Sequence, residues 1–183
     1  MKLISFYIVL VLGSVSLYGC GSSQKVEKSP IATYVMPCSE LVSGDGALRA
    51  WASGKSDSEM AARKKAQLAA SAELAAMLEK VVNVTVEEYS VGLSENDRGA
   101  AKSFLSEKTK IVVNQTLKGA AIVCDRWNKD ESTGQYTNYM VMELRGEEYL
   151  KALYKELDKN SSMSVDRKLL DKMFLEQINK NAQ

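Results

Sequence analysis

The sequence predicts an α+β fold in which a small antiparallel sheet of about three strands packs against long helices. Three observations predict it. Residues 48–53 alternate small apolar side chains with larger or polar ones, a long alanine-rich run with helical spacing follows, and two strand-like runs farther on flank a polar loop. The expected order is strand, helix, helix, strand, strand, helix, helix.

The first strand is expected over 48–53, ended by Gly54 and Lys55. Ser56 and Glu59 then match a capping box, which predicts that a helix begins there. The next run, 81–86, is rich in β-branched residues and could form a strand, but it continues a strong helix. We expect the helix to reach about Tyr89. Its predicted apolar stripe consists of Ala61, Leu68, Ala72, Ala75 and Val82.

The second half of the chain predicts another helix, a hairpin and two further helices. After a loop over 92–99, helical spacing marks residues 101–115, and Gly119 closes that helix. Strands are expected over 120–127 and 136–144. Helical stripes return over 149–157 and 165–178. The last helix could cover the domain or meet a partner, and we favour covering because amphipathic stripes are usually core.

The N-terminus has the pattern of an export signal. Lys2 precedes an almost unbroken apolar stretch over 3–12, which is too short for a spanning helix of roughly 20 residues. Residues 17–20, Leu-Tyr-Gly-Cys, resemble the lipobox of bacterial lipoproteins. The resemblance implies cleavage before Cys20 and lipid attachment to it. Ordinary secretory cleavage and an uncleaved anchor are the less favoured alternatives.

These features divide the chain into four parts. Residues 1–19 are the expected lipoprotein signal peptide, and 20–44 are a tether and N-terminal arm. Residues 45–160 are the expected α+β domain, and 161–183 hold the C-terminal helix. The tether is predicted from the small, polar and charged residues that follow Cys20.

Composition argues against several classes of function. The chain has 24 Lys+Arg and 23 Asp+Glu, and loss of Lys2 with the signal balances them, so nucleic acid is not an expected partner. There is no histidine, which removes Ser-His-Asp and Cys-His catalysis and imidazole metal ligands. No glycine-rich phosphate loop occurs. We therefore expect no enzyme activity, catalytic residues, metal site or cofactor.

Two cysteines remain besides Cys20. Cys38 and Cys124 would fold in a compartment where disulfides persist if the chain is exported. A bond between them would close a loop of roughly 85 residues and contribute ~4 kcal/mol in the chain-entropy model. Two separate buried thiols are the alternative, since free cysteine packs as a small apolar residue.

Several segments match a known pattern in order along the chain: 48–56, 61–66, 115–120 and the hairpin segments 126–127 and 139–141. Together they resemble the Lpp-twenty family of bacterial envelope lipoproteins, whose members include a Helicobacter antigen and flagellum-associated lipoproteins. The resemblance implies a dodecin-like domain and a non-enzymatic envelope component that often self-associates. It supplies no catalytic residues.

The favoured hypothesis is a membrane-anchored lipoprotein with a structural or assembly role through protein–protein contacts. Its expected partners are the membrane, through lipid on Cys20, and either further copies of the chain or envelope proteins. The alternative is a periplasmic small-ligand binding module, against which the sparse aromatic residues argue mildly. Gly21, rather than an aspartate, follows Cys20, so we expect the outer membrane with the domain facing the periplasm.

Overall fold

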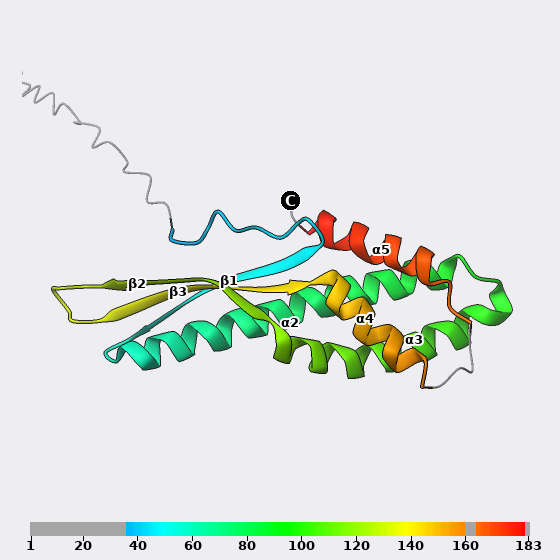
Figure 1. The fold of residues 1–183 in the computed structure, drawn as a ribbon, viewed down its shortest axis with the longest axis horizontal. Coiled ribbons are helices and arrows are strands. Elements are labelled where there is room, and N and C mark those ends of the chain that lie inside the picture. The colour runs from blue at the N-terminus through cyan, green and yellow to red at the C-terminus, as the bar shows by residue number, and fades with distance from the viewer. Residues whose placement is uncertain (1–35, 160–163, 182–183) are drawn as a thin grey trace, which may run out of the picture. The chain divides into compact units, whose positions relative to one another are not determined.

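A computed structural model describes residues 36–159 and 164–181 of the chain, and the α+β class is confirmed there. Figure 1 shows how the sheet lies against the helices. In chain order the elements are β1 (Ala47–Ser56), α2 (Glu59–Val91), α3 (Glu95–Thr116), the short 3₁₀ helix η1 (Leu117–Gly119), β2 (Ala121–Lys129), β3 (Tyr136–Arg145), α4 (Gly146–Leu157) and α5 (Arg167–Lys180). The predicted order of elements is also confirmed.

The sheet has the order β1-β3-β2, so β3 is central and the other two strands form the edges. Both pairings are antiparallel, with Trp51 opposite Val141 and Arg126 opposite Tyr139. Because side chains alternate between the two faces of a sheet, Leu48 and Ala50 share one face, while Trp51 lies on the other. Helix α2 packs against the first of these faces, across β1 and β3.

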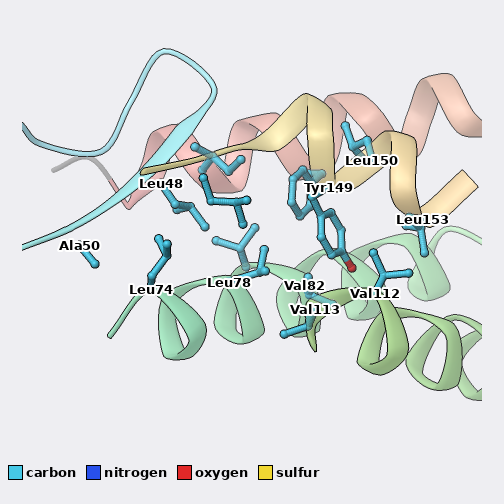
Figure 2. Close-up of a cluster of buried hydrophobic side chains, with 14 of the residues drawn as sticks. Leu48, Ala50, Leu74, Leu78, Val82, Val112, Val113, Tyr149, Leu150 and Leu153 are labelled. Atoms are coloured by element: carbon cyan, nitrogen blue, oxygen red, sulfur yellow. The ribbon is translucent and has the colours of Figure 1, made fainter. Parts of the chain in front are cut away.

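Helix α2 lies unusually close to β1 at Gly54. A Cβ atom there would lie 2.4 Å from the Ala62 carbonyl oxygen and 2.5 Å from the Ala66 nitrogen. Glycine on the strand and alanine on the helix therefore allow the two backbones to approach. The core continues along α2 through Leu74 and Leu78, which are fully buried (Figure 2).

The predicted apolar stripe of α2 is mostly wrong. Of its five residues only Val82 is buried; Ala72 is exposed, and Leu68 is 72% exposed. The buried row has a spacing of four and comprises Ala62, Ala66, Ala70, Leu74 and Leu78. Alanine occurs on several sides of this helix, so spacing alone allowed more than one choice of buried row.

The predicted capping box is also wrong. β1 continues past Gly54 to Ser56, which pairs with Tyr136, and no side chain caps the start of α2. The Ser56 hydroxyl instead accepts a hydrogen bond from the Ser58 amide at 3.5 Å. Pairing with β3 extends the strand over the residues that would have formed the cap. The expected continuation of the helix through 81–86 is confirmed, because α2 ends at Val91.

The remaining helices complete the core around Tyr149. Helix α3 returns beside α2, α4 follows β3 directly and packs on α3, and α5 packs on α2. The rings of Tyr149 and Phe174 stack with centroids 4.8 Å apart. Helix α5 therefore covers the domain, as expected, and buries Leu170 and Ile178. In the described ranges no helix combines the length and apolar character that crossing a membrane requires.

Candidate functional site

The chain immediately before β1 is fastened across the face of the sheet opposite α2. We call residues 36–43 the arm. The Trp51 indole N–H donates to the Pro37 carbonyl oxygen at 2.9 Å, and an Arg49 guanidinium N–H donates to the Val42 carbonyl oxygen at 2.7 Å. Trp51 and Arg49 both lie on this face of β1. The arm is thus part of the folded domain.

A disulfide joins the arm to the far edge of the sheet. It links Cys38 to Cys124 of β2, with the two Cα atoms 6.0 Å apart and 86 positions apart in sequence. Cys38 is buried and has a positive φ of 67°. In register, Cys124 lies opposite Val141, which lies opposite Trp51, so the arm reaches across all three strands. Val141 beneath it is fully buried.

The end of the arm also forms hydrogen bonds with outward-facing backbone groups at the start of β1. The Ser43 hydroxyl accepts a hydrogen bond from the Arg49 amide at 2.8 Å and donates to the Arg49 carbonyl oxygen at 3.2 Å. Gly44 and Ala47 exchange two backbone hydrogen bonds of 2.9 Å. The Arg49 side chain forms an ion pair of 2.6 Å with the largely buried Glu143. The outward backbone groups of Ala47 and Arg49 are therefore already occupied.

β2 forms the opposite edge of the sheet and is exposed along its length. No residue of β2 is fully buried, and Val123 and Trp127 are 41% and 39% exposed. The outer side of β2 pairs with no other strand in the described part of the chain. Figure 1 shows the β2–β3 hairpin extending past the first residues of α2, which leaves β2 largely uncovered by that helix.

A polar cluster attaches β2 to the rest of the domain. The Arg63 guanidinium on α2 forms an ion pair of 2.8 Å with Asp125, and the Asn138 amide donates to the same carboxylate at 2.5 Å. Asn138 also donates to the Arg126 carbonyl oxygen at 3.2 Å and is fully buried. Sequence reasoning missed this cluster, since its members lie on three elements with no shared motif.

Burial and nearby hydrogen bonds explain the shifted pKa values of three side chains. Burial raises the pKa of Tyr149, whose buried hydroxyl has no hydrogen-bond partner in the described residues. Burial, followed by a hydrogen bond to Asp171, raises the pKa of Tyr154. Hydrogen bonds from Ser132 lower the pKa of Asp130 in the hairpin loop. These groups do not come together in one site.

Four pockets in the described ranges differ in size. The smallest of them has a volume of about 10 Å³ and is lined by buried residues of α2, α3, α4 and α5 around Tyr149. Figure 2 shows the Tyr149 side chain reaching into this part of the core towards Val82. Three surface grooves have volumes of about 320, 450 and 430 Å³. Ligand pockets usually measure roughly 300–1,000 Å³ and enclose most of the ligand.

Metal-ligating residues do not gather in the described ranges, where no three His, Cys, Asp or Glu side chains are placed to hold one ion. The expected lipid-attachment residue, Cys20, and the expected signal peptide and tether lie outside those ranges. Cys38 and Cys124, by contrast, are brought together.

No family model, curated protein or solved structure matches this chain. The resemblance to the Lpp-twenty family therefore stays a prediction from the sequence motifs, as does the dodecin-like comparison. Those motifs lie in the sheet, the first part of α2 and the turn around η1.

Proposed function

We propose that this chain is a bacterial lipoprotein anchored in the outer membrane by lipid on Cys20, with its domain facing the periplasm. Its role is non-enzymatic: it acts through protein–protein contacts in the structure or assembly of the cell envelope. The lipobox-like residues 17–20 and the glycine at position 21 support the anchor and its location.

The observation that carries the proposal is the attachment of the arm to the sheet. The arm follows Cys20 in the chain, and both a disulfide and hydrogen bonds to β1 hold it. The chain that follows the proposed anchor is therefore covalently joined to the sheet where the folded domain begins. The disulfide also supports export, because such bonds persist in oxidising compartments outside the cytoplasm.

The exposed strand β2 supports a role in protein contacts. A strand with an unpaired edge presents backbone donors and acceptors to another chain. A ligand site in the core is less well supported, because the pocket around Tyr149 has a volume of about 10 Å³. Space of that size holds about one water molecule.

Two measurements on intact cells test the proposal. A clickable palmitate analogue should label the wild-type protein, and Cys20→Ala should abolish both the labelling and recovery in the outer-membrane fraction. A matched Ser22→Ala variant should keep both. Labelling that persists in Cys20→Ala would reject the anchor.

The role is tested by chemical crosslinking in the same cells, followed by identification of the proteins joined to the domain. We expect either further copies of the chain or an envelope protein. A domain that crosslinks to nothing, yet retains a small molecule through purification, would favour the ligand-binding alternative.

A further inference from the structure

The two edges of the sheet differ in how their backbone groups are satisfied. At the β1 edge, Ser43 and Gly44 occupy the outward-facing groups of Arg49 and Ala47. At the β2 edge, no backbone hydrogen bond from the described residues occupies the outer side between Ala121 and Lys129. The first residues of the β1 edge are therefore occupied, whereas the β2 edge is open to another strand along its length.

We propose that β2 pairs antiparallel with β2 of a second copy of this chain, about a two-fold axis at Trp127. The two three-stranded sheets then form one continuous sheet, with the same face covered by helices in both copies. This inference deepens the proposed function and rests on it, because it names the surface through which the envelope component assembles.

The charges on β2 fit this register. In a two-fold antiparallel pair, residues at equal distances on either side of the axis lie opposite each other and share one face. With the axis at Trp127, Asp125 lies opposite Lys129 of the second copy, and this pair occurs twice. Arg126 then lies opposite Asn128, so no like charges meet.

The neighbouring registers towards the start of β2 are less favourable. An axis at Asp125 or at Arg126 places that charged residue opposite its own copy, which destabilises the pair. An axis farther towards the start of β2 would involve the irregularity between Ile122 and Cys124, where the pairing with β3 shifts. From Cys124 to Lys129 the strand is regular, so the axis at Trp127 falls within its regular half.

The side chains at this register are already held in place. Arg63 and Asn138 fix the Asp125 carboxylate on the face that α2 covers. The Lys129 ammonium lies 5.7 Å from the centre of the Tyr136 ring. Trp127, at the axis, is partly exposed, and tryptophan is enriched among the residues that contribute most to protein interfaces.

Cysteine crosslinking of the mature, lipidated protein tests the register. At the axis, paired Cα atoms lie about 4.5–5.5 Å apart, within the range that a disulfide spans. We expect Trp127→Cys to give at least ten times more oxidant-dependent dimer than Glu131→Cys. Glu131 is also exposed, in the hairpin loop, but its two copies would lie more than about 20 Å apart.

Charge reversal provides a second test. Lys129→Glu places two carboxylates opposite each other and should lower the association constant in detergent at least tenfold. The matched variant Lys118→Glu makes the same charge change outside the strand and should leave association unchanged. At a concentration where the protein is monomeric, Lys118→Glu should keep the wild-type urea midpoint and Lys129→Glu should lower it only slightly, because both side chains are exposed and Lys129 gives up its contact with the Tyr136 ring.

Several outcomes would overturn the inference. They are equal crosslinking at positions 127 and 131, a wild-type protein that stays monomeric at tens of micromolar, and association unaffected by Lys129→Glu. A monomer that still crosslinks to another envelope protein in cells would leave the proposed function standing. Loss of the anchor would appear separately, in the Cys20 labelling.

Discussion

Opening the disulfide between Cys38 and Cys124 should destabilise the domain substantially. The bond joins residues 86 positions apart. In the chain-entropy model, closing a loop of that length lowers the entropy of the unfolded chain, which adds about 4.5 kcal/mol to the free energy of unfolding. The hydrogen bonds from Trp51 and Arg49 to the arm would remain, at about 1 kcal/mol each. We therefore expect a folded but less stable domain whose arm detaches more readily.

Urea unfolding of the mature protein in detergent, followed by tryptophan fluorescence, measures this effect. The Cys38→Ser/Cys124→Ser variant should lose about 3–5 kcal/mol of unfolding free energy. Wild-type protein in a reductant should lose the same amount, and the reductant should not change the variant. A difference below about 1 kcal/mol between oxidised and reduced wild type would refute the reasoning, as would complete alkylation of both thiols without reductant.

Three further tests use urea unfolding of variants. Gly54→Ala should destabilise the domain by about 3 kcal/mol, since its Cβ would meet the α2 backbone, whereas Gly99→Ala in exposed helix should stabilise it by about 0.5–1 kcal/mol. Leu74→Ala should lower the free energy of unfolding by about 3 kcal/mol, and Leu68→Ala should leave it almost unchanged, because only Leu74 is buried. Urea midpoints measure both changes. Equal losses would contradict the assignment of the buried row of α2. Burial raises the pKa of Tyr149 in the folded protein above its ordinary 10.0. As the pH rises above 10, the unfolded chain loses this proton before the folded protein does. The stability that the protonated hydroxyl gives below pH 10 is therefore lost as the pH rises further. Tyr149→Phe should reduce that alkaline loss in urea midpoints measured from pH 8 to 11, and an unchanged slope would contradict the shift.

The sequence predicted the order of the elements well because their local signals agree. Helical spacing, β-branched runs and glycine-containing turns all indicated the same element along most of the chain. Even the ambiguous run over 81–86 was correctly taken as helix, because it continued a strong helical segment. The start of α2 was wrong, because pairing with Tyr136 kept Ser56 in the strand.

The buried side of α2 could not be predicted from spacing. The row through Ala62 and Ala66 is selected by Gly54, a residue on another element that allows the close approach. Leu68 looks like a core residue in sequence but is 72% exposed on the surface of the helix. The choice between these rows depends on tertiary contacts that a single sequence does not display.

The candidate site was predictable only in part. Cys38 and Cys124 could be named as a pair, but the sequence left disulfide and separate thiols open, since their distance depends on how the arm crosses the sheet. The cluster of Arg63, Asp125 and Asn138 had no sequence signal. The exposed edge of β2 likewise follows from strand order, which the hairpin alone does not determine.

The mass of the N-terminal tryptic peptide, from protein isolated out of the outer-membrane fraction, tests the proposed anchor most directly. We predict a peptide that begins at Cys20 and ends at Lys25, with a mass increased by a thioether-linked diacylglycerol. A peptide that begins at another residue, or an unmodified Cys20, would contradict the lipid anchor on which the proposed function depends.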